Sequence, residues 1–185
     1  MKTDLRVVKT KRAIEQAFFQ LIEEKGFEKV RIVDIAKKAE VNRNTIYLHY
    51  GTKEGIIKDV VERQFVGGFT NLEFNKINKF RNNRKRVELF FQTLFKIVSE
   101  QIEVYRILLT DENLAGYLSM TKTRIETYAM ENLKDTSKNR AIVEYIVSGT
   151  YGVLSRWIIF AYGTIEGNIK ILTDLTLSNL KGIQL

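Results

Sequence analysis

The side chains best suited to chemistry lie between Asn42 and Tyr50, in the run NRNTIYLHY. Arg43, Asn44 and Thr45 combine a guanidinium group with two short side chains that donate and accept hydrogen bonds. In a DNA major groove, arginine pairs with guanine and asparagine with adenine, each through two hydrogen bonds. These residue types therefore favour the reading of bases, although an ordinary surface turn carries similar side chains.

The rest of the chain offers little for catalysis. It contains no cysteine and one histidine, His49. Disulfides, thiolate zinc sites and cysteine nucleophiles are thereby excluded, and few ligands remain for a metal. We find no glycine-rich phosphate loop and no nucleophile motif. Acidic pairs such as Asp111-Glu112 are typical of helix starts. We expect no enzymatic activity, no cofactor and no metal.

Composition and charge indicate a helical protein with an anionic partner. The 185 residues include no proline and 11 glycines, too few turn residues for an all-β domain. Lys and Arg total 30 against 22 Asp and Glu, a net charge of +8. Such an excess of positive charge is typical of proteins that bind nucleic acid or an acidic membrane surface. It is also found on basic surfaces that bind no partner.

Residues 145–162 form the most apolar stretch, and Arg156 is its one charged residue. The stretch is short for a membrane span, and a central arginine is costly there. We therefore predict a buried helix. No apolar leader is evident at the start of the chain, so we expect a cytoplasmic protein without a membrane partner.

Apolar residues recur at helical spacing throughout, which predicts an all-α fold of about nine helices. A small head, residues 1–52, precedes a helical body, residues 53–185, and a polar, basic loop is expected at 75–86. The expected helices are 10–24, 31–39, 43–49, one capped by Thr52, 84–101, 103–109, 112–134, 138–162 and 166–181.

The second and third helices have the length and spacing of a helix-turn-helix. Ile35 and Ala36 face the interior, and the small Ala39 lets the next helix approach. Val41 fills the turn, and Asn42 is a suitable N-cap for the following helix. That helix would turn Ile46 and Tyr50 inward and the polar side chains outward.

At this point the sequence resembles the TetR family of transcriptional regulators, over about residues 8 to 60. The resemblance implies an all-α protein in which a three-helix DNA-binding head joins a body that dimerises and binds a ligand, usually a repressor. The matching motifs are Gly26-Phe27, Asp34-Ile35-Ala36, Ala39-Glu40-Val41-Asn42, Thr45-Ile46-Tyr47, His49-Tyr50 and Lys53-Glu54.

The resemblance also implies DNA-contacting residues. Arg43 would bind a guanine, Asn44 an adenine, and the Tyr47 hydroxyl a phosphate. Lys53 would hold a phosphate by its charge and by the helix N-terminus. In the alternative interpretation, Tyr47 packs against the first helix and His49 is an ordinary surface residue. The expected contacts are Arg31, Asn42, Arg43, Asn44, Thr45, Tyr47, His49 and Lys53.

The sequence departs from the family pattern in three places. Glu40 replaces the glycine of the turn, so the chain must tolerate a strained backbone there or form a different turn. Arg31 replaces the serine or threonine that usually caps the second helix, which loses a cap and offers a phosphate contact. The segment from Thr52 to Gly55 lacks the glutamate of a capping box.

The body carries many aromatic residues at helical spacing, a pattern typical of a core as well as of a ligand cavity. Thr121 or Thr150 would supply polar contacts to an unknown small-molecule effector. The aromatic residues expected at such a cavity are Phe91, Phe95, Tyr105, Tyr117, Tyr128, Tyr151 and Trp157.

Small residues in the helix predicted at 138–162 allow a second helix to approach closely. This helix and the last one resemble the dimer-forming pair of many TetR-like proteins, so we predict a twofold homodimer through four helices. Alternatively, these residues fill a core within one chain. The expected interface residues are Gly149, Gly152, Val153, Arg156, Trp157, Phe160, Ile169, Leu172 and Thr176.

Two functions remain open from the sequence. The first is a homodimeric repressor that binds a palindromic operator in double-stranded DNA and is released by a small molecule. The second is a helical protein-binding module whose helix-turn-helix no longer reads DNA, which Glu40 and Arg31 keep possible. Salt distinguishes them, because phosphate contacts make affinity fall steeply with ionic strength.

Overall fold

The computed structural model describes residues 5–63, 79–80 and 83–183. Those residues form helices and connecting turns without a strand, which confirms the all-α prediction. Of the loop predicted at 75–86, residues 75–78 and 81–82 lie outside the described residues, and residues 84–86 belong to α6. The helices are α1 (Leu5–Lys25), η1 (Phe27–Lys29), α2 (Ile32–Lys38), α3 (Arg43–Tyr50), α4 (Lys53–Val61), α6 (Arg84–Ser99), α7 (Ile102–Thr110), α8 (Ala115–Met130), α9 (Ser137–Phe160) and α10 (Ile165–Leu180).

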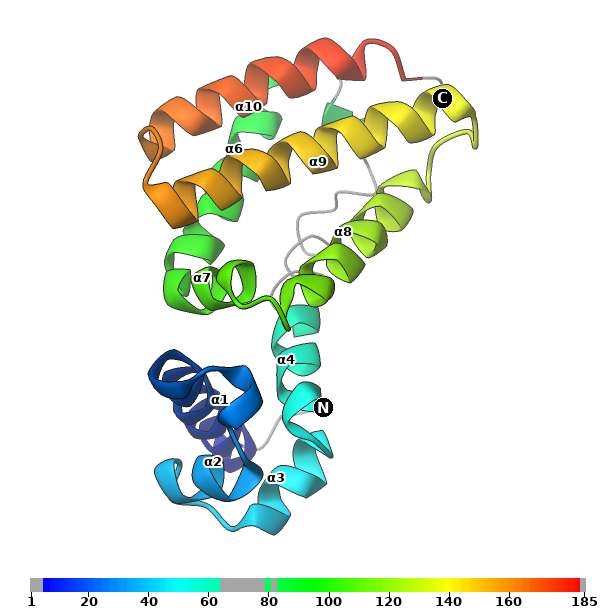
Figure 1. Ribbon diagram of the computed structural model, residues 1–185. Coiled ribbons are helices and arrows are strands. Elements are labelled where there is room, and N and C mark those ends of the chain that lie inside the picture. Colours follow the sequence, from blue (N-terminus) through cyan, green and yellow to red (C-terminus); the bar gives the residue numbers. More distant parts are fainter. Residues whose placement is uncertain (1–4, 64–78, 81–82, 184–185) are drawn as a thin grey trace.

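Helices α1 to α4 form the head, at the lower end of Figure 1. The apolar stripe of α1 supplies Ile14 and Phe18, which are fully buried against Ile35 of α2 and Ile46 of α3. Burying such side chains stabilises the fold by roughly 1.5–3 kcal/mol each. The head therefore has an apolar core of its own, on which the helix-turn-helix rests.

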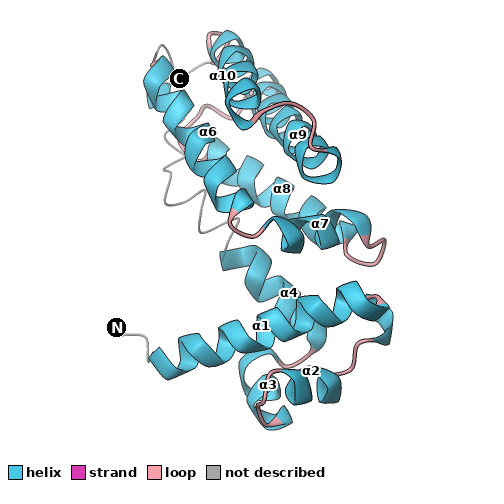
Figure 2. Ribbon diagram, turned by 90° about the vertical axis from the view of Figure 1, so that its left-hand side faces the viewer, coloured by secondary structure: helices cyan, strands magenta, loops and turns pink. Residues whose placement is uncertain are grey.

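The body is built around α6, α8, α9 and α10. Helices α9 and α10 lie side by side and antiparallel at the end farthest from the head (Figures 1 and 2). Helix α10 also packs on α6, and α8 packs on α9. Phe91 and Phe95 of α6 are each 1% exposed at the centre of this bundle.

The cores of the head and the body meet at α7 and at the beginning of α8. Leu108, Leu114 and Leu118 belong to the same apolar cluster as the residues of the head, and α4 packs against α8. An ion pair between Glu62 and Arg124 lies at the same junction. Helix α4 also contributes four buried residues to the head core, so it bridges the two parts. The boundary after residue 52 stays a prediction.

The apolar stretch 145–162 lies mostly within α9. Ile146, Val147, Leu154 and Ile158 form one stripe of this helix that is buried in the body core. Tyr145 and Phe160 are exposed, so within one chain the helix is covered on one side and not on several. Within the described ranges, no helix is long and apolar enough to span a bilayer.

Candidate nucleic-acid interface

The turn between α2 and α3 is tightly bonded. The Val41 N–H donates to the Ala36 carbonyl at 3.0 Å, and the Asn42 side chain accepts from the Asn44 N–H at 2.9 Å. Asn42 is thus the N-cap of α3, as predicted. Glu40 has a φ of 55°, in the left-handed region that favours glycine. The chain tolerates a strained backbone at this residue and keeps the usual turn.

Helix α3 presents one polar face outward. Ile46 is fully buried, whereas Tyr47 is 51% exposed, so Tyr47 is not packed away against α1. Arg43 and Asn44 are exposed, and Thr45 and His49 are half-buried. Within the described part of the chain, Arg43 has no ion-pair partner. Its guanidinium is available for an external ligand.

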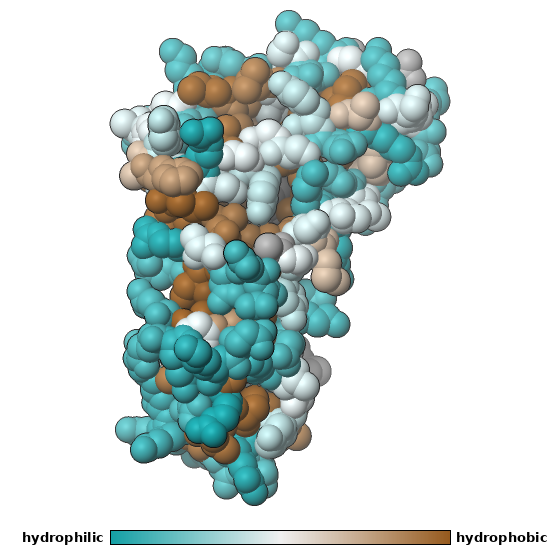
Figure 3. Space-filling model, viewed as in Figure 1, coloured by the Kyte–Doolittle hydropathy of each residue, from teal (hydrophilic) through white to brown (hydrophobic). Residues whose placement is uncertain are grey.

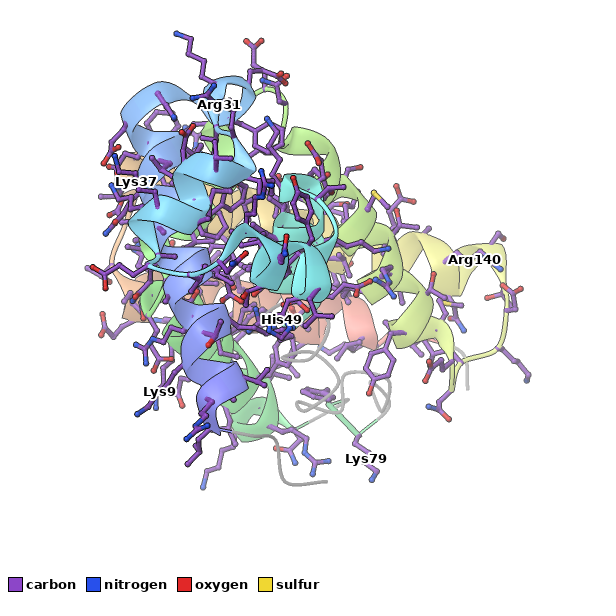
Figure 4. The ribbon with its side chains drawn as sticks, turned by 90° about the horizontal axis from the view of Figure 1, so that it is seen from below. Lys9, Arg31, Lys37, His49, Lys79 and Arg140 are labelled. Carbon is purple, nitrogen blue, oxygen red and sulfur yellow. The ribbon has the colours of Figure 1, made fainter. Side chains whose placement is uncertain are left out.

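Basic residues lie to one side of α3 on the lower surface of the head. In the view from below, Lys9, Lys37 and Arg31 lie along one side, and His49 lies near the middle (Figure 4). They come from α1, α2, the residue before α2, and α3. This side of the head therefore offers cationic side chains, which suit a phosphate backbone.

Lys53 has partners within the head. Its ammonium donates to the carbonyls of Phe27 at 2.9 Å and Glu28 at 3.3 Å. It also lies 4.2 Å from the centroid of the Phe27 ring. The side chain thus joins α4 to η1. Its predicted phosphate contact stays a prediction and would have to share the ammonium with these carbonyls.

Asp34 replaces the missing cap of α2. Its carboxylate accepts from the Arg31 N–H at 3.3 Å and pairs with Lys25 at 2.8 Å and with the Arg31 side chain at 3.4 Å. The Lys25 hydrogen bond, followed by the Arg31 contacts, lowers the pKa of Asp34 from 3.8 to about 2. Sequence reasoning missed this cap, although an acidic residue three positions after an N-cap is a local signal for it.

Gly55 allows α3 and α4 to approach each other. A Cβ atom at this position would lie 2.0 Å from the carbonyl oxygen of Tyr50. The Gly55 N–H donates to the Thr52 hydroxyl at 3.1 Å, which caps α4. The sequence shows only that a glycine lies inside a predicted helix. That the glycine is needed for a close contact with the backbone of Tyr50 is seen only in the structure.

A polar network holds the end of α3 against α1 and α4. The Tyr50 hydroxyl donates to Glu15 at 2.9 Å, and Arg63 donates to Glu15 at 2.5 Å and to Asp59 at 2.8 Å. Burial is the main reason that the pKa values of Glu15 and Tyr50 are both raised. Tyr50 therefore faces inward as expected, but onto a carboxylate. No local sequence pattern joins residues so far apart.

The aromatic residues expected at a ligand cavity are distributed differently. Of the seven, Tyr151 alone lines the apolar cavity between α6, α8 and α9, together with Thr121 and Thr150. Phe91, Phe95 and Tyr105 are buried in the core, and Trp157 contacts Phe95 edge to face at 5.1 Å. Tyr117 packs half-buried on the head core and Tyr128 on the body core.

The expected interface residues separate into two groups. Gly149, Gly152, Arg156 and Phe160 are exposed on α9. In contrast, Leu172 and Thr176 are 3% and 7% exposed within the chain, so they offer almost no area to a partner. Val153, Trp157 and Ile169 are half-buried against the body core. Sequence reasoning missed the exposed Tyr145, Ile171 and Leu175, and an apolar surface is visible over α10 (Figure 3).

The geometry of α2, the turn and α3 defines a helix-turn-helix protein. Comparisons with known proteins agree, because residues 15–60 match the model of bacterial regulatory proteins of the tetR family. The structure also resembles the fatty acid degradation regulator FadR from Bacillus halodurans, with a TM-score of 0.66 at 18% identity, covering 94% of this chain and 97% of that one. At this identity the likeness shows the fold alone.

Two curated relatives are uncharacterised HTH-type transcriptional regulators of Bacillus subtilis strain 168. YxbF is 36% identical over 61 residues, which cover 32% of this chain but only 16% of YxbF. YvdT is 28% identical over 149 residues, 78% of this chain and 72% of YvdT. The likeness to the tetR family model is thus confined to the helix-turn-helix part, residues 15–60, and the chain as a whole has the fold of solved TetR-family regulators.

Proposed function

We propose that the protein is a homodimeric transcriptional regulator that represses genes by binding a palindromic operator and is released by a small-molecule effector. The observation that carries the proposal is the outward face of α3. This face combines the unpaired guanidinium of Arg43 with the exposed amide of Asn44. Side chains of these types can read base edges in a major groove.

The support for α3 is rigid, as base reading requires. Asn42 caps its first turn, Ile46 anchors its middle, and Tyr50 bonds its last turn to Glu15. A helix held at three points presents its outer side chains in a fixed geometry, which lowers the entropic cost of ordering them on DNA.

A second copy of the chain is the proposed partner of α9 and α10. Tyr145 and Phe160 on α9 are 56% and 63% exposed, and Ile171 and Leu175 on α10 are 52% and 45% exposed. Gly149 and Gly152 lie between the two aromatic residues on α9 and allow close helix approach. Twofold pairing would place two α3 helices on half-sites one or more helical turns apart.

The proposed response to an effector runs through α8. This helix lines the apolar cavity of the body and also packs on α4 of the head. A ligand that favours one position of α8 would therefore shift the population of head orientations. Release from DNA would follow when the two heads no longer match the half-site spacing.

The test is selection of bound DNA from a random duplex library at near-physiological salt. Enrichment of a palindrome supports both DNA reading and dimeric binding. Arg43→Ala should then relax the selected sequence, while the control Lys96→Ala, at an exposed lysine of α6, should leave it unchanged. If Arg43→Ala weakened binding to random and selected DNA equally, the proposal that Arg43 reads bases would be wrong.

A protein-binding module is the second candidate, favoured by the internal hydrogen bonds of Lys53 and by the exposed carboxylate of Glu40. Both features reduce the charge available for phosphates. Under this alternative, folded dimeric protein would enrich no DNA sequence. Any residual DNA affinity would also lack the steep salt dependence of phosphate contacts.

A further inference from the structure

Two cavities adjoin between α8 and α9 and differ in chemistry. The inner cavity, of about 40 Å³, and the outer cavity, of about 180 Å³, share Leu118, Lys122 and Tyr151 in their walls. The outer cavity adds the hydroxyls of Ser119 and Ser148. The apolar residues that complete the inner wall are Phe90, Leu94, Ile125, Ile146, Val147 and Leu154.

The inner cavity suits hydrocarbon. Of its two threonines, Thr121 already donates its hydroxyl to the Tyr117 carbonyl at 2.9 Å, so it offers little to a polar ligand. An apolar chain would lose its water shell here, which stabilises binding by about 0.8 kcal/mol per buried CH₂. At about 40 Å³, however, the space is far below the 300–1,000 Å³ typical of ligand sites. A chain can enter only when α8 and α9 separate.

The outer cavity offers the ammonium donors of Lys122 to a polar head group. Lys122 has one ion pair among the described residues, with Glu126 at 3.6 Å, longer than a normal hydrogen bond of about 2.7–3.2 Å. That Glu126 oxygen is buried and has no hydrogen-bond partner in the described chain. The ammonium is therefore incompletely satisfied. It lies in a wall with three hydroxyls, and the Glu126 carboxylate is its one ion-pair partner among the described residues.

We propose that the two cavities form one site for an amphipathic carboxylate, with its hydrocarbon chain between α8 and α9 and its carboxylate at Lys122. The contact with Glu126 is too long for a hydrogen bond, so the Lys122 ammonium keeps N–H donors for a ligand carboxylate, and Ser119, Ser148 and Tyr151 can donate to the remaining lone pairs. This inference rests on the proposed function, because it names the class of effector that the body would sense.

The same site is connected to the head. Leu118 lines both cavities and also belongs to the apolar cluster of the head. Widening the inner cavity moves α8, and moving α8 displaces Leu118 from its neighbours in that cluster. A bound chain would thus favour a different position of the head, without any contact between the ligand and α1 to α4.

The experiment measures binding of dodecanoate, dodecanol and dodecyl phosphate to the full chain, below their micelle concentrations and without DNA. We expect one dodecanoate per chain. Lys122→Met, which keeps an apolar stem but removes the charge, should weaken dodecanoate binding by about tenfold, the effect of losing a charge-assisted hydrogen bond, and leave dodecanol binding unchanged. Lys170→Met is the matched control and should bind all three ligands like the wild type.

Two results would overturn the inference. Equal affinity for dodecanoate and dodecanol, unaffected by Lys122→Met, would remove the carboxylate site. If dodecyl phosphate bound more tightly than dodecanoate and its binding depended on Lys122, the ligand of the site would be a phosphate and not a carboxylate. If Lys122→Met does not fold, Ser148→Ala is the second variant. It should weaken dodecanoate binding by less than Lys122→Met and leave dodecanol binding unchanged. Because DNA is absent, failure of operator binding leaves these outcomes unaffected, and failure here leaves operator binding intact.

Discussion

The carboxylate of Asp111 accepts a hydrogen bond from the backbone N–H of Phe27 at 3.2 Å, across 84 positions of sequence. It joins the turn between α7 and α8 to η1 of the head. The carbonyl of the same Phe27 accepts from Lys53 at 2.9 Å. The peptide groups of one residue are therefore held from both the body and α4, and η1 becomes a fixed point between the two parts.

Asp111→Ala should loosen this junction. The Phe27 N–H would lose a charged acceptor, and such bonds contribute about 1.5–3 kcal/mol, so we expect the free energy of unfolding to fall by about 1–2 kcal/mol for this partly exposed pair. Urea denaturation measures the change. Glu112→Ala alters an adjacent, exposed acid and serves as the control. Identical midpoints for the two variants would mean that the bond does not hold the head.

Glu40→Gly should stabilise the protein. A glutamate at a φ of 55° costs about 1–2 kcal/mol relative to glycine, and the greater freedom of glycine in the unfolded chain offsets about 0.4–1 kcal/mol. We expect a net gain of about 0.5–1 kcal/mol in urea denaturation. Glu40→Gln keeps the strain and should leave stability unchanged.

The same pair of variants separates strain from charge at the DNA. Both remove a carboxylate from the exposed turn, and both should bind duplex DNA more tightly than the wild type at low salt. If only Glu40→Gly gained affinity, the backbone of the turn would be responsible instead of the charge.

Asp34 should make stability depend on pH in the acid range. Its pKa is lowered from 3.8 to about 2 in the folded protein by Lys25 and Arg31. The unfolded chain therefore binds the proton more readily, so the ionised carboxylate stabilises the fold above about pH 4, and this stabilisation disappears as pH falls toward 2. Asp34→Asn should accordingly be less stable than the wild type at pH 7.

Urea midpoints at several pH values between 7 and 2 check this expectation. The difference between Asp34→Asn and the wild type should shrink as the pH falls below about 4. Glu28→Gln, which alters an exposed acid of η1, should show no such convergence. A difference that stayed constant down to pH 2 would assign the effect of Asp34→Asn to its neutral hydrogen bonds.

Local signals predicted the fold well. Helices α2 and α3 begin and end within one residue of the predicted bounds, because the apolar spacing and caps such as Asn42 depend only on residues that are close together in the sequence. Helix α1 begins at Leu5, five residues earlier than predicted. Its first turns expose Leu5 and Val8 at 76% and 47% and therefore lack the buried stripe on which the prediction depended.

The candidate sites were harder to predict because they depend on distant contacts. The Glu15–Arg63 pair spans 48 positions, and neither residue has a local pattern that reveals it. Aromatic residues at helical spacing suit a core and a cavity equally, so the sequence favoured Phe91 and Phe95, which fill the core. Lys122 was overlooked because a lysine on a helix usually faces solvent, whereas here it shares a wall with apolar side chains.

Phe160→Asp and Leu175→Asp should convert the proposed dimer to monomers. Their side chains are 63% and 45% exposed, so the changes leave the core intact. Trp157→Asp, in contrast, would also break the contact with Phe95. A charge at the centre of an interface costs at least about 2 kcal/mol, so sedimentation should show dimer dissociation rising at least thirtyfold, about 2 kcal/mol.

Leu48→Asp provides the control for these variants, because Leu48 is 81% exposed but lies on α3. It should sediment like the wild type even if it lowers DNA affinity. Since a monomer can fill only one half-site, Phe160→Asp should lose its preference for a palindrome over a single half-site. If Phe160→Asp and Leu175→Asp both remained dimeric at the wild-type concentration, α9 and α10 would not form the interface, and half-site spacing would have to be set by another surface.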